Sequence, residues 1–468
     1  MAAPIKGDFS QGSVGKIIFK LSLPIMLAEL VHLAYNIVDR LFISHMPGTG
    51  TAALTGVGVA FPLISLITAF ANLFGTGGAP LASIARGEGD YEKSARIQET
   101  AFTTLLITGV VVTAVMFLGA PYFLPVLGGD EETLPYALDY FSIYVLGTIP
   151  VMISLGMNSF INGQGFAKIG MVTVIIGAAL NIALDPLLIY NAGMGVKGAA
   201  VATVVSQLVS AVWVVLFLTG KRPAVRIRKL QISGPDLKAI AKLGATGFMF
   251  KATNSVVQAI TNIVLKTWGG AASTLYIGAM TIINSIREIT MCPLSGITYG
   301  ATPVMSFNYG ARKPERVSKA MSVMLFSCLI INIVFWALMV FAPGWMFSLF
   351  TSDPALIATG SVCARIYFLA FPFMTLQLTG QNTFTSLNFP KYALFFSLLR
   401  KIILVAPLTL LLPRMGAGVY GPFWAETVSQ VIGSVACFTT MYYKVWRPLR
   451  KAAEENAAME NATQEKAG

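Results

Sequence analysis

Long apolar stretches separated by short polar segments recur along the whole 468-residue chain. Twelve of them are long enough to cross the hydrocarbon core of a bilayer as α-helices, which takes about 20 residues each. The predicted spans are residues 16–44, 53–84, 99–120, 134–162, 169–190, 197–219, 240–265, 274–305, 319–342, 357–387, 392–412 and 419–443. The sequence therefore predicts an all-α integral membrane protein rather than a barrel of short alternating strands.

The two halves of the chain resemble each other at a fixed offset of 223 residues. The matching positions are Pro80 and Pro303, Gly87 and Gly310, Phe166 and Phe389, Lys168 and Lys391, Gly195 and Gly418, Gly198 and Gly421, Ser206 and Ser429, and Gln207 and Gln430. Each half holds six spans, so both copies enter the membrane in the same direction. We expect two six-helix lobes related by a parallel repeat, with a pseudo-two-fold axis along the membrane normal. A duplicated static scaffold or channel is the alternative.

The repeat and the charged segments suggest four regions. The N-terminal six-helix lobe is expected at residues 1–220, and a basic cytoplasmic linker at 221–239. The C-terminal six-helix lobe follows at 240–446, and a polar cytoplasmic tail at 447–468. We expect the chain after about Lys451 to be frayed or disordered.

The composition agrees with a membrane protein and explains the basic charge. The chain is 55% hydrophobic and 12% charged, with a mean hydropathy of +0.70 and a net charge of +12. Soluble domains typically carry about 25% charged residues. With the N-terminus inside, most Lys and Arg residues fall in loops on the inner side, which places both termini in the cytoplasm. The location is then the cytoplasmic (inner) membrane, and the charge needs no nucleic acid.

Several function classes lack their sequence signals. The four Cys and two His residues show no metal-ligand spacing, so the cysteines are expected to be small core residues. No phosphate-binding loop of the Gly-x4-Gly-Lys-Ser/Thr type occurs, which argues against an ATP-driven pump. No nucleophile or metal set is clustered, so we do not expect an enzyme. The predicted partners are small-molecule drugs or metabolites and membrane lipid.

Polar side chains within the first span are the first candidate site. Glu29, His32, Asn36 and Asp39 fall along one helical face. A charged side chain at mid-bilayer costs about 2.5–3.5 kcal/mol on insertion scales, so such residues usually face a watery cavity or a partner. The face is either a cation-binding stripe or a polar ladder that joins helices.

The fifth span carries the second candidate. Asn181 and Asp185 are four residues apart on one face, and Pro186 removes a backbone donor next to the carboxylate. Thr203 in the sixth span could add a hydroxyl, although such a residue equally often bonds its own helix. These hard oxygen ligands suit a small cation, or its exchange for a proton.

Together these features resemble the multidrug and toxic compound extrusion (MATE) family, prokaryotic type. The resemblance covers about residues 12–446 and includes the duplicated twelve-span plan, the segment 38–45 around Asp39, and Asn181-x-x-x-Asp185-Pro186. The paired Pro-x6-Gly motifs, Pro80/Gly87 and Pro303/Gly310, also match. The resemblance implies an alternating-access antiporter that exports organic, often cationic, compounds in exchange for Na⁺ or H⁺, with no other cofactor.

The same resemblance implies a coupling site in the N-terminal lobe. Its ligands, which would also be the metal ligands if the ion is Na⁺, fall on Asp39, Asn181, Asp185 and Thr203. Residues that could line the substrate cavity or act in gating are Glu29, His32, Asn36, Lys251, Arg287, Glu288 and Glu426.

The chain departs from the family pattern at three positions. His32 stands where some members have Gln, and Lys251 and Thr375 stand where others carry Glu and Asp. These departures argue against a second coupling site in the C-terminal lobe. Glu288 or Glu426, the latter at the repeat position of Thr203, could neutralise Lys251 or form a structural ion pair. The rival function is a flippase of a lipid-linked saccharide with the same general fold.

Overall fold

The computed structural model describes residues 8–467, apart from the side chains of Lys251, Ser255 and residues 460–467. The part of the chain that it describes contains helices and no strand. The helices of the first half are α1 (Val14–Ser44), α2 (Gly50–Gly87), α3 (Tyr91–Val126), α4 (Leu134–Tyr144), α5 (Thr148–Gly163), α6 (Ala167–Pro186) and α7 (Val196–Thr219). Those of the second half are α8 (Gly234–Gly269), α9 (Ser273–Gly310), α10 (Pro314–Phe341), α11 (Pro343–Ser348), α12 (Pro354–Phe368), α13 (Phe371–Ser386), α14 (Pro390–Leu398), α15 (Ala406–Leu411), α16 (Gly421–Met441) and α17 (Arg447–Ala467).

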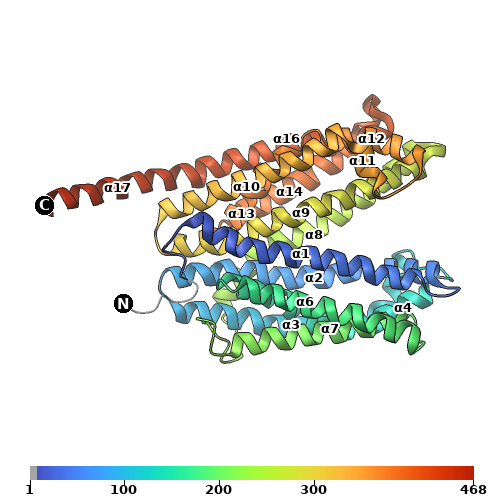
Figure 1. The fold of residues 1–468 in the computed structure, drawn as a ribbon, viewed down its shortest axis with the longest axis horizontal. Helices are drawn as coiled ribbons and strands as arrows, with labels where there is room; N and C mark the ends of the chain where they lie inside the picture. Colours follow the sequence, from blue (N-terminus) through green and yellow to red (C-terminus); the bar gives the residue numbers. More distant parts are fainter. Residues whose placement is uncertain (1–7, 468) are drawn as a thin grey trace. The chain divides into compact units, whose positions relative to one another are not determined.

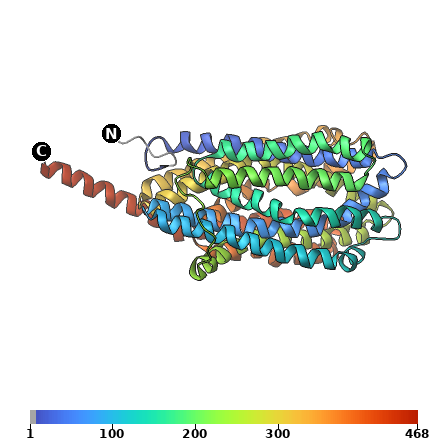
Figure 2. The same cartoon turned by 90° about the horizontal axis from the view of Figure 1, so that it is seen from below.

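Each of the twelve predicted spans corresponds to one helix or to consecutive helical segments (Figures 1 and 2). The fourth span is α4 and α5 joined by the 3-10 turn η1 (Val145–Gly147), and the eleventh is α14 and α15 joined by the π-helix η4 (Leu399–Val405). The tenth span is α12 and α13, bent by 47° at the break. Pro372 opens α13, where its missing N–H costs no helical hydrogen bond.

Length and hydropathy alone identify most of these spans. Among the described residues, eight helical segments are long and apolar enough to cross a membrane, and the bent pair of α12 and α13 makes a ninth. The other three spans, α8, α9 and α16, carry more polar residues. Two features were not predicted, namely the short helix α11 and the helical conformation of α17. The α17 sequence is rich in Ala, Glu, Lys and Arg, all strong helix formers, which explains a helix where a frayed tail was expected.

Two compact units make up the chain. One contains Leu23–Phe248, and the other contains Phe9–Ser22 and the chain from Met249 on. The first turns of α1 therefore belong to the second unit, and the first turns of α8 belong to the first. Our predicted boundaries at residues 220 and 240 do not assign residues 9–22 to the second unit or residues 240–248 to the first.

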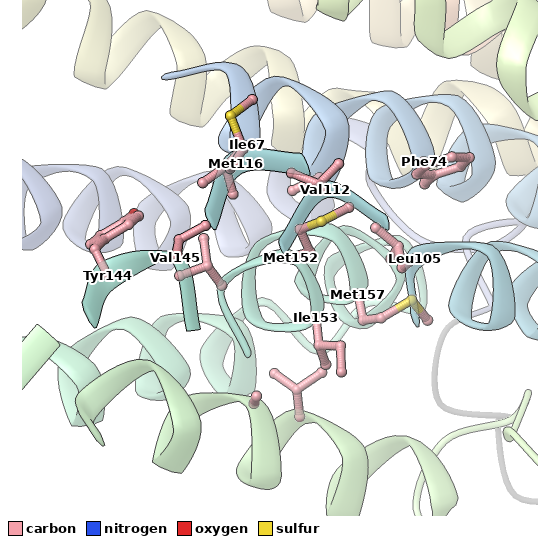
Figure 3. Packing of buried hydrophobic residues seen from close by; sticks show 14 of the residues in the cluster. Ile67, Phe74, Leu105, Val112, Met116, Tyr144, Val145, Met152, Ile153 and Met157 are labelled. Atoms are coloured by element: carbon pink, nitrogen blue, oxygen red, sulfur yellow. The ribbon is translucent and has the colours of Figure 1, made fainter. Parts of the chain in front are cut away.

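The core of the first unit lies between α2, α3, α4 and α5 (Figure 3). Ile67, Leu105 and Met152 are among its fully buried side chains. The backbones of α2 and α5 approach closely, because a Cβ on Gly75 would lie 2.7 Å from the carbonyl oxygen of Gly156. Small residues of this kind let membrane helices pack tightly without a hydrophobic driving force.

The basic linker is fixed to the first unit through Glu99 of α3. This carboxylate is 2% exposed and accepts hydrogen bonds from the backbone N–H of Arg228 at 2.9 Å and of Lys229 at 3.3 Å. The side-chain amide of Gln231 donates to its second oxygen at 2.5 Å. Asp236 adds an ion pair with Arg96 at 2.6 Å. The linker is thus a docked segment with a defined conformation.

A similar set of hydrogen bonds holds residues 9–12 in the second unit. Arg316 donates from Nη2 to the carbonyl of Phe9 at 2.8 Å and from Nη1 to that of Gly12 at 2.9 Å. Its Nε also donates to Asn308 Oδ1 at 3.0 Å, and Asn308 itself donates to the Phe9 carbonyl at 3.0 Å. The segment before α1 is therefore tied to the ends of α9 and α10.

Candidate functional site

Four side chains from three helices meet in the first unit. Asp39 comes from α1, Asn181 and Asp185 from α6, and Thr203 from α7. Asn181 donates from Nδ2 to Asp185 Oδ1 at 3.3 Å and lies 3.4 Å from Thr203 Oγ1. The carboxyl groups of Asp39 and Asp185 are close enough to interact electrostatically. The structure therefore brings together the four residues that the sequence analysis selected.

Three oxygens of this cluster lack hydrogen-bond donors among the described residues. Asp185 is fully buried and Asn181 is 2% exposed. Asp39 Oδ1, Asn181 Oδ1 and Asp185 Oδ2 are buried and have no hydrogen-bond partner in the described part of the chain. Buried acceptors are nearly always paired, so these three oxygens indicate a missing positive partner. Carboxylate, amide and hydroxyl oxygens fit Na⁺, and two adjacent carboxylates equally fit a shared proton.

The backbone next to Asp185 is irregular because the following residue is a proline, Pro186. Pro186 has no N–H, so it cannot bond the carbonyl of Ile182 one turn earlier. The chain continues as a π-helical turn, Leu187–Asn191, directly after the proline. Such π-turns within helices are frequent at functional sites. Asp185 therefore stands at a break in its helix.

Two tyrosines of α4 border the cluster and were missed by the sequence analysis. The side chain of Tyr140 lies next to Thr203. The ring of Tyr140 stacks on that of Tyr144, with centroids 5.8 Å apart and planes at 18°. Both rings are buried. Their spacing of four residues, which places them on one face of a predicted span, was the available signal.

The remaining polar residues of α1 lie apart from the cluster. Glu29 and His32 are half-buried and precede Asp39 by ten and seven residues, which is about 15 and 10 Å along a helix. Asn36 donates to the carbonyl of His32 at 2.6 Å, within its own helix. The His32 ring packs edge-on against Tyr35 at 5.0 Å. These residues share one face of α1 as predicted, but of the four only Asp39 belongs to the cluster with Asn181, Asp185 and Thr203.

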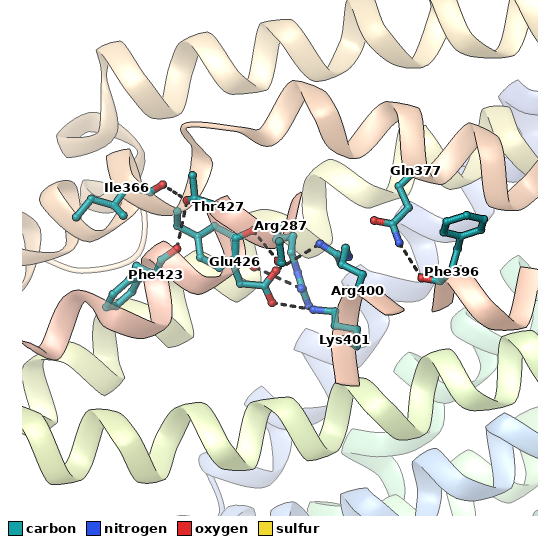
Figure 4. A network of polar contacts seen from close by, with 11 residues as sticks. Arg287, Ile366, Gln377, Phe396, Arg400, Lys401, Phe423, Glu426 and Thr427 are labelled. Carbon is teal, nitrogen blue, oxygen red and sulfur yellow. Dashed lines mark hydrogen bonds and ion pairs between the residues drawn. The ribbon is translucent and has the colours of Figure 1, made fainter. Parts of the chain in front are cut away.

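A second buried cluster lies in the second unit (Figure 4). Glu426 of α16 forms ion pairs with Lys401 Nζ at 2.8 Å and with Arg400 Nη1 at 3.4 Å. All three side chains are less than a tenth exposed. Arg287 of α9 lies beside them, with Nη1 3.4 Å from the hydroxyl of Tyr367. Glu426 thus has Arg400 and Lys401 as its ion-pair partners.

The other predicted residues of the second half are distributed differently. The side chain of Lys251 lies outside the part of the chain that the structure describes. Glu288 is exposed. Thr375 is fully buried, and its hydroxyl lies 2.8 Å from Asn332 Nδ2, which indicates a structural role. The sequence analysis did not select Arg400 and Lys401, although two adjacent cations inside an apolar span were a signal that an acid must lie nearby.

Comparison with known proteins identifies the family. The sequence profile of the MatE family matches residues 24–187 and 251–411, which is more than half of the chain and includes part of both halves. The chain belongs to the MATE family.

Named MATE relatives are distant in sequence but match over most of their length. The chain is 24% identical over 384 residues to the multidrug export protein MepA of Staphylococcus haemolyticus, covering 80% of this chain and 83% of the relative. It is 22% identical over 445 residues to MepA of Staphylococcus aureus NCTC 8325, covering 93% and 95%.

Solved structures share the fold. A MOP superfamily transporter from Pyrococcus furiosus has a TM-score of 0.88 at 23% identity, covering 96% of this chain and all of that one. A multidrug resistance MATE family transporter in an outward-facing conformation also has a TM-score of 0.88, at 22% identity and 96% and 99% coverage. The predicted all-α membrane fold with twelve transmembrane helices is confirmed, and the protein is a multi-pass member of this family.

Proposed function

We propose that this MATE protein is a secondary active antiporter that exports organic compounds, often cationic, in exchange for Na⁺ or H⁺. The relatives named as multidrug export proteins support the substrate class. The observation that carries the proposal is the buried group of unpartnered oxygens on Asp39, Asn181 and Asp185. Two adjacent buried carboxylates are stable only when a proton or a metal cation compensates their charge.

This site gives the coupling a physical basis. With the cavity open outward, Na⁺ or H⁺ enters among Asp39, Asn181, Asp185 and Thr203 and removes the repulsion between the two carboxylates. The helices that carry them, α1 and α6, can then rearrange and release the exported compound outside. Return to the inward-open state frees the ion to the cytoplasm. The ion and the compound must favour different states, because a ligand with equal affinity for both shifts nothing.

The proposal includes a location and a set of partners. The protein lies in the cytoplasmic membrane with both termini in the cytoplasm, and its partners are small molecules and lipid. It needs neither ATP nor nucleic acid and is not an enzyme, in line with relatives named for export. A lipid-linked saccharide flippase on the same fold would move its substrate without responding to the two aspartates.

The deciding experiment measures dye efflux from vesicles with Na⁺ and pH gradients imposed separately. Replacement Asp185→Asn or Asp39→Asn is expected to reduce gradient-driven efflux at least about tenfold, within the range of typical coupling energies. Ser44→Ala is the matched control on α1, because Ser44 donates to the Leu41 carbonyl of its own helix. Full efflux by both aspartate variants, at normal membrane levels, would refute the assignment.

A further inference from the structure

The second unit contains a small polar pocket that the coupling mechanism does not use. It lies among α8, α9, α12, α16 and η4, and its volume is about 20 Å³. The polar residues that line it are Asn254, Gln258, Thr261, Asn284, Arg287, Tyr367, Lys401 and Glu426. A cavity of about 10–15 Å³ already holds one water molecule, so this one accepts a single particle of about that size or slightly larger.

The charges around the pocket do not balance. Among the described residues that line it, Glu426 is the one carboxylate, and both of its oxygens are already engaged, Oε1 by Lys401 and Oε2 by Arg400. Arg287 has no carboxylate oxygen of the described residues within 4.0 Å, and its neighbour Glu288 is exposed. Among the described side chains, the three cations Arg287, Arg400 and Lys401 therefore share one buried acid, Glu426. An excess of positive charge within a membrane span is costly unless a counter-charge compensates it.

The lining also provides donors for a negative ion. Arg287 keeps guanidinium N–H groups beyond the one near Tyr367, and the Lys401 ammonium has three donors of which Glu426 takes one. Asn284 donates from Nδ2 to Gln258 Oε1 at 3.0 Å, and this hydrogen bond orients the two amide side chains that line the pocket. The arginine remains charged at any physiological pH, so a permanent cation faces the space.

We propose that this pocket binds a compact monovalent anion of about the size of chloride, held by Arg287 and Lys401. The anion supplies the charge that Glu426 alone does not, and it fits a space that excludes a larger organic anion. It occupies a different unit from the Asp39–Asp185 cluster and does not depend on the antiport proposal. Its role is to complete the ion-pair network that joins α9, α16 and η4.

Binding is testable on the purified full-length protein at constant sodium concentration and ionic strength. Chloride or bromide replaces isethionate, an anion too bulky for the pocket, and thermal unfolding is followed as the halide concentration rises. The unfolding temperature is expected to rise and saturate, because a ligand of the native state stabilises it by mass action. Crystals grown with bromide should show an anomalous peak in the pocket.

Two variants have opposite expected effects, which a purely structural ion pair would not produce. Arg287→Gln leaves both Glu426 ion pairs intact and should raise the half-saturating halide concentration about tenfold, the cost of one charge-assisted hydrogen bond. Glu426→Gln removes the competing negative charge and should lower it about tenfold. Arg365→Gln is the matched control, since Arg365 bonds the Val340 carbonyl away from the pocket and should leave halide binding unchanged.

The proposal fails if the wild-type unfolding temperature is the same in chloride, bromide and isethionate. It also fails if bromide appears only at the protein surface, or if Glu426→Gln folds but binds halide no more tightly than the wild type. If Arg287→Gln does not fold, the bromide map and the Glu426→Gln titration still decide the question.

Discussion

Asn181 donates a hydrogen bond to Asp185 one helical turn further along α6, at 3.3 Å. The same amide nitrogen lies 3.4 Å from the hydroxyl of Thr203 on α7. One amide group thus orients an acid on its own helix and a hydroxyl on its neighbour. This arrangement leaves the Asn181 carbonyl oxygen and Asp185 Oδ2 without partners.

Replacement Asn181→Ala should weaken cation binding while leaving the fold intact. The variant loses one oxygen ligand and the donor that fixes Asp185, so we expect about a tenfold rise in the half-saturating Na⁺ concentration. The measurement is thermal unfolding of the purified protein as Na⁺ rises at several fixed pH values. Ser44→Ala should bind as the wild type does; equal Na⁺ responses in Asn181→Ala and wild type would remove Asn181 from the site.

Replacement Glu99→Ala should release the linker from the first unit. The backbone N–H groups of Arg228 and Lys229 would lose their acceptor, at a cost of about 1 kcal/mol for each hydrogen bond. Trypsin should then cleave after these two basic residues markedly faster, as seen by limited proteolysis. Glu92→Ala changes an exposed acid in the first turn of α3 and serves as the control. An unchanged cleavage rate would show that the linker is held by other contacts.

Replacement Gly75→Ala should destabilise the first unit by about 1–3 kcal/mol, because the added methyl group would overlap the backbone of α5. Gly58 lies on the same helix with no atom within 4 Å of an added Cβ. Gly58→Ala should therefore be neutral or stabilise by up to about 1 kcal/mol. Thermal unfolding in one detergent compares the pair. Equal losses in both variants would mean that α2 and α5 do not approach closely at Gly75.

Replacement Arg316→Ala should free the segment before α1. It removes hydrogen bonds to Phe9, Gly12 and Asn308, and each such bond is worth about 1 kcal/mol. Hydrogen exchange measured by mass spectrometry should show faster exchange in residues 9–13 than in the wild type. Lys319→Ala, an exposed change on the same helix α10, should leave that exchange unchanged. Slow exchange in Arg316→Ala would assign the anchoring to Asn308 and Lys313 instead.

The fold was largely predictable because its signals are local. A span needs only a long apolar run, and the repeat needs only aligned prolines and glycines, so all twelve spans appeared in the sequence. The residues of the first-unit cluster were selected in the same way, since Asn181 and Asp185 are four apart and Asp39 is an isolated acid in an apolar run. Their role as the coupling site stays a prediction.

The rest depended on helix rotation and on partners far apart in the sequence. Lys401 and Glu426 are 25 residues apart on different helical segments, and Lys401 lies in the π-helical turn that begins at Leu399. The contact of Tyr140 with Thr203 likewise requires knowing how α4 faces α7. The helical tail was missed because its polarity was interpreted as disorder, although its composition favours a helix.

The last helical segments, α16 to α17, offer a site for fusing a marker protein. From Gly421 the chain runs helically through α16, the π-turn η7 (Tyr442–Trp446) and α17 to Ala467, and α17 extends past α10 and α13 of its own unit in Figure 1. A helical protein fused in register after residue 459 would inherit the orientation of α16. A membrane protein of this size, about 50 kDa, could then be aligned in electron micrographs by a marker that lies outside the detergent micelle.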